Sequence, residues 1–271
     1  MSLRRKVFAT VLLVAALAAT VAVLVAGVFG SHSPTAKANR SIAPEKPGAV
    51  LLVPGYGGSV RSLEPLARRL RAAGRDVTVV TLPDGATGDL GAQARSVRSQ
   101  AAAVLRRTAA PSLDVVGYSA GGVVVRLWLS QYGGREVVRR VVTLATPHHG
   151  TRLAEVAGAL APDLCPLACQ QLSPNSELLG RLNRGDETPN GPTWLSAWSA
   201  TDQVVTPPSS ARLNGAVNVA LQSVCADSAV QHGQLPADPL VIGLVRRSLG
   251  AAPITAPTAR DCGALRRLGA T

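Results

Sequence analysis

Short apolar segments alternate with amphipathic segments from residue 49 to residue 144. The apolar segments, which are typical of strands buried on both faces of a sheet, are 49–53, 76–82, 113–116 and 137–144. The segments between them have apolar residues at helical spacing, and they are 62–73, 90–108 and 120–131. Strands that alternate with helices predict an α/β fold: a mostly parallel central sheet with helices on both faces.

This alternation breaks between residues 151 and 192, where Gly, Pro and Asn are frequent. We expect a partly helical excursion over one end of the sheet, and whether it acts as a lid stays open. The pattern then returns with strands at 193–199 and 216–221 and a helix at 239–249, which Pro239 can start. Residues 47–271 are therefore expected to form one domain.

The N-terminal residues have the pattern of an export segment. Arg4, Arg5 and Lys6 precede an uncharged, apolar stretch at 7–29, and a polar linker follows at 31–46. The stretch is long enough to span a bilayer, so residues 1–30 are either a cleaved signal peptide or a retained transmembrane anchor. In both cases the domain would lie outside the cytoplasm, either secreted or anchored to the membrane.

Charge and composition narrow the classes of partner. The net charge is +12, but residues 47–271 hold 22 basic and 15 acidic residues, a net charge of +7. Aromatic residues make up only 3% of the chain, so the aromatic platforms on which nucleic-acid bases stack are not expected. We expect no nucleic-acid partner, and we interpret the arginines at 68, 69, 71 and 75 as a solvated helix face.

Four cysteines agree with an oxidising compartment. The simplest pairing closes a small loop between Cys165 and Cys169 and leaves Cys225 to bond Cys262 near the C-terminus. A zinc site made by four thiolates is the alternative, although the spacings lack paired CxxC motifs.

A GxSxG motif lies at residues 117–121, between a predicted strand and a predicted helix. The glycines permit a tight turn that exposes the hydroxyl of Ser119 at the carboxyl end of the strand. The motif is short enough to occur by chance, but this position is the one its chemistry requires. The sequence therefore predicts Ser119 as a nucleophile.

A serine hydroxyl is a weak nucleophile without an oriented base, and in this arrangement an acid and then a histidine follow the serine along the chain. His32 lies in the linker, and His148 and His149 precede the candidate acids. His232 is therefore the predicted base.

Asp202 is the predicted acid, because it follows the strand predicted at 193–199 and ligand-facing groups collect at the carboxyl ends of parallel strands. Asp227 is the second choice. Asp238 is a further rival close to the base in sequence, and Asp186 is expected to form a solvated pair with Glu187.

The tetrahedral intermediate of acyl transfer needs N–H donors for its oxyanion. One is expected to be the backbone N–H of Ala120, directly after the nucleophile. We assign the other to the backbone N–H of Tyr56, in the Gly-rich loop after the first strand, where glycines permit close approach.

Several separated stretches together resemble the small extracellular triacylglycerol lipases of bacteria, the class 2 group of the α/β-hydrolase superfamily. They are VPGYGG from Val53, GYSAGG from Gly117, LATPHHGT from Leu144, QQLSPNSELLGRLNRGDETP from Gln170, SATDQVV from Ser199 and the His232 loop. One departure is Pro54-Gly55, where related lipases usually have His-Gly. His148 and His149 would belong to a structural motif, with contact to substrate or a metal as the alternative.

The resemblance implies the triad Ser119, Asp202 and His232, and hydrolysis of acylglycerol-type esters through an acyl-enzyme without a metal or organic cofactor. The expected partner is a lipid or small ester, with membrane association through residues 7–29, and we expect a monomer. The alternatives are an acyltransferase or thioesterase on cell-envelope lipids, and a silent lipid-binding relative. The acyl chain length is left open by the sequence.

Overall fold

The strands form at the short apolar segments, because a strand covered on both faces needs apolar side chains on both sides. The computed structural model describes residues 42, 43, 45–188 and 190–271. The strands in these residues form one six-stranded sheet in the order β2-β1-β3-β4-β5-β6. All neighbouring pairs are parallel. The strands are β1 (Ala49–Val53), β2 (Val77–Val79), β3 (Leu113–Tyr118), β4 (Val138–Leu144), β5 (Thr193–Trp198) and β6 (Val217–Ala220). The predicted α/β fold class is confirmed.

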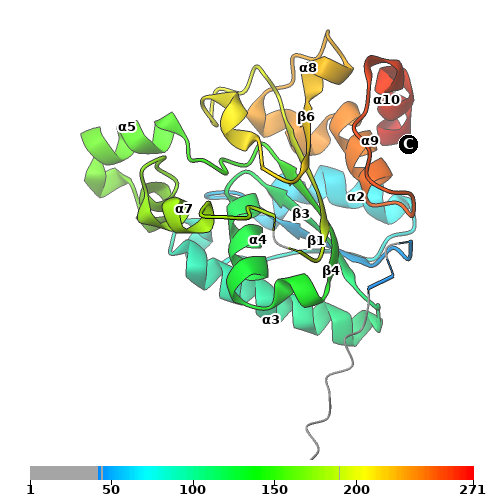
Figure 1. Cartoon of the computed structure of the whole chain (residues 1–271), viewed down its shortest axis with the longest axis horizontal. Helices are drawn as coiled ribbons and strands as arrows, with labels where there is room; N and C mark the ends of the chain where they lie inside the picture. The colour runs from blue at the N-terminus through cyan, green and yellow to red at the C-terminus, as the bar shows by residue number, and fades with distance from the viewer. Residues whose placement is uncertain (1–41, 44, 189) are drawn as a thin grey trace, which may run out of the picture. The chain divides into compact units, whose positions relative to one another are not determined.

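Helices cover both faces of the sheet (Figure 1). One face packs against α3 (Leu90–Thr108) and α4 (Ala120–Gln131), and the other against α2 (Glu64–Ala72) and α9 (Pro239–Ser248). Side chains alternate between these two cores along a strand, because successive residues of a strand point to opposite faces. The fully buried Leu51 belongs to the first core, and its neighbour Leu52 belongs to the second.

The remaining helices are short or peripheral. The α-helices are α5 (Arg152–Leu160), α6 (Leu167–Gln171), α7 (Glu177–Leu182), α8 (Leu221–Val224) and α10 (Cys262–Ala270). The 3₁₀ helices are η1 (Val60–Leu63), η2 (Pro83–Ala86), η3 (Gly134–Glu136), η4 (Pro162–Leu164), η5 (Pro208–Ala211), η6 (His232–Ala237) and η7 (Ala259–Asp261). The excursion predicted at 151–192 thus contains α5, η4, α6 and α7.

The strand predicted at 76–82 is shorter than expected. β2 ends at Val79, and the backbone of Thr81 bonds a side chain instead of a strand. The amide of Gln100 donates to the Thr81 carbonyl at 2.7 Å and accepts from its N–H at 3.1 Å. A side chain of α3 therefore satisfies the backbone where the chain leaves the sheet.

A buried charge cluster lies toward the amino end of the strands. The carboxylate of Asp114 is inaccessible to solvent and accepts from Arg75 at 2.5 Å and from Arg139 at 2.6 Å. Both arginines also donate to the Leu249 carbonyl, just beyond α9. The interpretation of Arg75 as part of a solvated face is therefore wrong, whereas the three arginines at 68, 69 and 71 are exposed.

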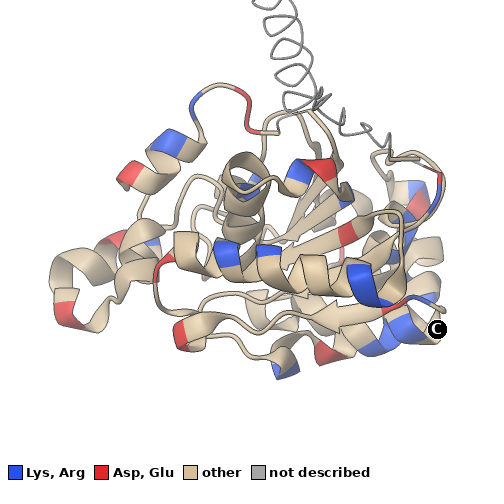
Figure 2. Cartoon of the chain, turned by 90° about the horizontal axis from the view of Figure 1, so that it is seen from below, with Lys and Arg blue, Asp and Glu red and all other residues tan. Residues whose placement is uncertain are grey.

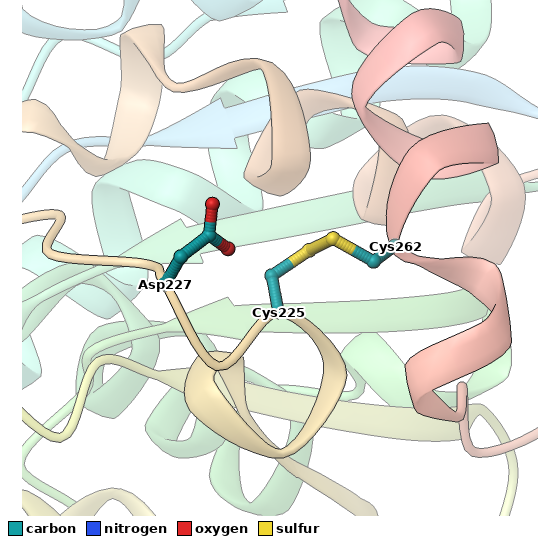
Figure 3. Close-up of side chains that lie close together, drawn as sticks. All are labelled: Cys225, Asp227 and Cys262. Atoms are coloured by element: carbon teal, nitrogen blue, oxygen red, sulfur yellow. A yellow bond between two sulfur atoms is a disulfide. The ribbon is translucent and has the colours of Figure 1, made fainter.

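The two disulfides have the simplest pairing expected from the sequence. Cys165 bonds Cys169, and Cys225 bonds Cys262, with Cα atoms 5.2 Å apart in each pair. Figure 3 shows the second bond joining the segment after α8 to α10, with Asp227 beside it. The alternative of a zinc site is wrong, because all four sulfur atoms are committed to disulfides.

In the part of the chain that the structure describes, no helix combines the length and the hydropathy needed to cross a membrane. The export segment predicted at 1–30, with its apolar stretch at 7–29, and residues 31–41 of the predicted linker lie outside the described residues.

Candidate active site

The GxSxG turn holds Ser119 in a strained conformation. Ser119 has φ 53° and ψ −131°, a region that costs a residue with a side chain of the order of 1–3 kcal/mol. The turn is tight: a Cβ added at Gly117 would lie 2.6 Å from the Cα of Gly122. The Ser119 N–H donates to the Leu144 carbonyl at 2.8 Å, which fixes the turn to the end of β4. The hydroxyl is thus placed at the carboxyl end of β3 and at the N-terminus of α4, where the helix dipole favours negative charge.

The structure brings the three predicted triad residues together. Nε2 of His232 lies 3.0 Å from Oγ of Ser119, and Nδ1 of His232 lies 2.7 Å from Oδ2 of Asp202. All three residues are buried, with at most 9% of their surface exposed. With Nδ1 as the donor to the carboxylate, Nε2 is an acceptor and can take the proton of the hydroxyl.

The second oxygen of Asp202 fixes the carboxylate in place. Oδ1 accepts from the backbone N–H groups of Val204 at 2.8 Å and Val205 at 3.0 Å. Because both oxygens are engaged, the carboxylate has one orientation toward His232.

The rival acids have other partners. Asp227 is exposed and makes two hydrogen bonds of 2.9 Å with Arg266, which lowers the pKa of the carboxyl group. Asp238 caps the N-terminus of α9 through the Leu240 and Val241 N–H groups, and Asp186 accepts from the Thr188 N–H. Among these four acids, only Asp202 contacts the histidine of the site.

The loop after β1 lies directly against the nucleophile. A Cβ added at Gly55 would lie 2.7 Å from the Cβ of Ser119 and 3.2 Å from its Oγ. A Cβ at Gly121 would meet the carbonyl oxygens of Val53 and Pro54 at 2.3 and 2.4 Å. Glycine at these positions lets β1 and the start of α4 approach closely, and Tyr56, the residue after Gly55, lines the same cavity as Ser119.

His148 and His149 lie apart from the triad in a second polar network. Burial lowers the pKa of His148 well below its usual range, and its Nε2 lies 3.1 Å from Oγ1 of Thr143. Nε2 of His149 lies 2.8 Å from Oε1 of Glu187. Glu187 is 9% exposed, so the expectation of a solvated pair with Asp186 is wrong for this residue, which links two loops.

An apolar cavity of about 270 Å³ opens beside Ser119. Its lining includes Tyr56, Ser119, Pro147, Thr151, Leu153, Ala154, Ala157, Leu164, Cys169, Leu172, Val204 and Val205. Most of the wall comes from the excursion between β4 and β5, whose residues the sequence did not assign to a site. The available signal was the spacing of Leu153, Val156 and Leu160, which places three apolar side chains on one exposed helix face.

The mouth of this cavity is apolar and carries few charges. Most of the large apolar side chains that are exposed in the described residues lie on the excursion: Leu153, Val156, Leu160, Leu164 and Leu167. Residues 153–169 include Glu155 and Asp163 and no lysine or arginine. Elsewhere, basic residues are spread over several helices with acidic residues among them (Figure 2). The exposed apolar side chains of the excursion therefore lie in a segment without basic residues, which begins after Arg152 at the start of α5.

The fold and this site define the class of the protein: it has the α/β-hydrolase fold. Residues 48–164 match the family model described as the alpha/beta hydrolase fold. No curated protein matches the sequence.

Solved structures of similar fold include three lipases or lipase-related proteins. The mature lipase BlEst2 of Bacillus licheniformis has a TM-score of 0.63 and 18% identity over 75% of this chain and 92% of its own. Lipase B of Aspergillus fumigatus has a TM-score of 0.68 and 21% identity over 88% of this chain and 63% of its own. A lipase-esterase related protein of Clostridium acetobutylicum has a TM-score of 0.53 and 13% identity over 75% of this chain and 94% of its own. At these identities, the likeness establishes the fold.

Proposed function

We propose that the protein is an extracytoplasmic serine esterase of the lipase type, which hydrolyses carboxylic esters with an apolar acyl chain. The observation that carries this proposal is the hydrogen-bonded series from Ser119 through His232 to Asp202 beside an apolar cavity. The lipases with the same fold support the proposal, and the apolar mouth suits an acylglycerol-type substrate presented by a lipid surface.

The reaction proceeds through an acyl-enzyme. Oγ of Ser119 attacks the ester carbonyl carbon while its proton passes to Nε2 of His232, and Asp202 stabilises the resulting imidazolium. The N–H groups of Tyr56 and Ala120 hold the oxyanion. His232 then gives the proton to the leaving alcohol. Water attacks the acyl-enzyme, again with His232 as base, and the acid and free Ser119 are released.

The proposed location rests on the disulfides and on the N-terminal sequence. The two disulfides favour an oxidising compartment, and the sequence of residues 1–30 favours export. We therefore propose a secreted or membrane-anchored monomer with the catalytic domain outside the cytoplasm.

The proposal is tested with p-nitrophenyl esters of increasing acyl length and with a serine-reactive fluorophosphonate. The wild-type protein should turn over the esters, and mass spectrometry should find the phosphonate on Ser119. Ser119→Ala should lose turnover by at least about 10³-fold, whereas Ser130→Ala, on an exposed turn of the same helix, should retain it. Undiminished turnover in Ser119→Ala, or no turnover and no labelling in the wild type, would overturn the proposal.

A further inference from the structure

The loop that carries the histidine has an alternating pattern of burial. Ser228, Val230 and His232 are buried, whereas Ala229 and Gln231 between them are exposed. Such alternation is typical of an extended segment, in which every second residue faces the same side. We call residues 228–232 the base loop. Residues 228–231 belong to no helix or strand, so the hydrogen bonds of regular secondary structure do not hold them. Contacts with side chains of other segments therefore help to fix the position of the base loop.

Each of the three buried residues of the base loop accepts a side-chain hydrogen bond at its carbonyl oxygen. The hydroxyl of Tyr118 donates to the His232 carbonyl at 2.9 Å. The hydroxyl of Thr201 donates to the Val230 carbonyl at 3.1 Å, and the amide of Gln222 donates to the Ser228 carbonyl at 2.9 Å. The carbonyls at 228, 230 and 232 are therefore held at three successive points.

Two of the donors directly precede triad residues. Tyr118 comes before Ser119 at the end of β3, and Thr201 comes before Asp202 after β5. The nucleophile and the acid reach His232 through their own side chains, while their neighbours reach the backbone of the same loop. Tyr118 and Ser119 together restrict the distance between His232 and the nucleophile. Thr201 and Asp202 together restrict the distance between His232 and the acid.

The third donor joins the acid loop to the base loop. The Gln222 side chain accepts from the Ala200 N–H at 2.8 Å and donates to Oγ of Ser199 at 3.0 Å, besides its bond to the Ser228 carbonyl. One side chain of α8 therefore connects the segment before Asp202 with the start of the base loop.

Tyr118 also packs against the ring of the base. Its ring lies 5.2 Å from the imidazole of His232, between ring centroids. Burial and, secondarily, the charge of Asp202 raise the pKa of Tyr118, so its hydroxyl is a neutral donor at neutral pH.

We infer that Tyr118, Thr201 and Gln222 are positioning residues that hold the His232 ring within hydrogen-bond reach of Ser119 and Asp202. This inference rests on the proposed function, because it concerns the same proton transfer. The three side chains act on the base loop and do not line the apolar cavity, so they should affect turnover and leave binding of the ester unchanged.

The first test is Tyr118→Phe, which keeps the ring and removes the hydroxyl that holds the His232 carbonyl. The substitution leaves the buried His232 carbonyl without its side-chain donor and allows the imidazole to shift relative to Ser119. We therefore expect kcat to fall about 10-fold with KM unchanged, which corresponds to about 1.4 kcal/mol of transition-state stabilisation. The matched control is Tyr132→Phe, which removes a hydroxyl bonded to Arg95 at 3.1 Å on the surface and should leave kcat unchanged.

The second test is Gln222→Ala, which leaves the Tyr118 contact in place and changes a half-buried surface residue. It should lower kcat several-fold, and Gln222→Glu should not restore it, because a carboxylate cannot donate to the Ser228 carbonyl. The control Gln100→Ala removes an amide that bonds Thr81 far from the triad and should leave kcat unchanged.

A proton spectrum distinguishes positioning from a general loss of structure. The proton between His232 and Asp202 should give a far-downfield resonance in the wild type, and this resonance should broaden or shift in Tyr118→Phe while the control keeps it. Wild-type kcat in both Tyr118→Phe and Gln222→Ala would overturn the inference, and so would a change confined to KM. Those results would leave the proposed function standing, because it is tested separately by turnover and labelling of Ser119 in the wild type.

Discussion

Replacement of Asp202 by asparagine should reverse the direction of the hydrogen bond at His232. The position now held by Oδ1 faces two backbone donors, the N–H groups of Val204 and Val205 at 2.8 and 3.0 Å. The new amide must place its oxygen there, because its NH₂ group would leave both donors unpaired. The NH₂ group then faces Nδ1 of His232, which becomes an acceptor, and the ring proton moves to Nε2. In that tautomer His232 donates toward Ser119 and cannot take its proton.

The expected loss in kcat is about 10⁴-fold, as for the same exchange in serine proteases, which corresponds to about 5.4 kcal/mol of transition-state stabilisation. KM should change little, because Asp202 does not line the cavity. Turnover of p-nitrophenyl butyrate and the thermal unfolding midpoint are the measurements.

Asp238→Asn is the matched control, because Asp238 also accepts from the N–H groups two and three residues ahead, those of Leu240 and Val241. It should change the free energy of unfolding little, because asparagine is as good an N-cap as aspartate, and it should leave kcat unchanged. A kcat for Asp202→Asn within 10-fold of the wild type, in a folded protein, would refute the assignment of Asp202 as the acid.

Three further predictions concern other parts of the molecule. Asp114→Ala should lower the free energy of unfolding by about 3–5 kcal/mol in a chemical denaturation, because it removes the carboxylate from a buried charge cluster; a change under 1 kcal/mol would contradict the importance of this cluster. Replacing Cys225 and Cys262 by serine should cost about 4 kcal/mol, the chain-entropy value for a sequence separation of 37, and an unchanged melting temperature would count against it. The double substitution Leu160→Ser and Leu164→Ser should lower the hydrolysis of emulsified esters and leave the hydrolysis of a soluble short-chain ester unchanged. The reason is that both side chains are over 80% exposed beside the cavity, where they can contact a lipid surface. Equal losses on both substrates would exclude this contact.

The sequence predicts a strand or a long helix well where a local pattern of residues determines it. The residues of β1, α3 and α4 are those predicted, because apolar runs of this length are buried between helices and the ends of the helices carry clear signals. Asp89 caps α3 by accepting from the Ala92 N–H, and α4 begins directly after Ser119. The placement of Ser119, Asp202 and His232 also follows from a rule, since functional groups collect at or beyond the carboxyl ends of the strands of a parallel sheet.

The sequence does not predict contacts between residues that are far apart along the chain. Helix α10 was not predicted, and its position depends on packing against α9, where a Cβ at Gly269 would lie 1.8 Å from the Pro239 carbonyl oxygen. Glu187 was interpreted as solvated because its loop is polar, yet it is buried by its contacts with His149 and with the Asn214 N–H. No local pattern distinguishes such a residue from a surface carboxylate, because its partners come from other loops.

The position of His232 depends more on contacts with distant residues than the positions of Ser119 and Asp202 do. Ser119 and Asp202 follow β3 and β5, inner strands with a hydrogen-bonded neighbour on each side. His232 follows the edge strand β6 only after a short helix and the base loop. The sheet therefore does not fix the position or the orientation of its ring. Side-chain contacts supply additional constraints: the three donors at the base loop carbonyls, and the disulfide of Cys225 three residues before the loop. Changes in these contacts should therefore alter the rate of proton transfer before they alter the fold.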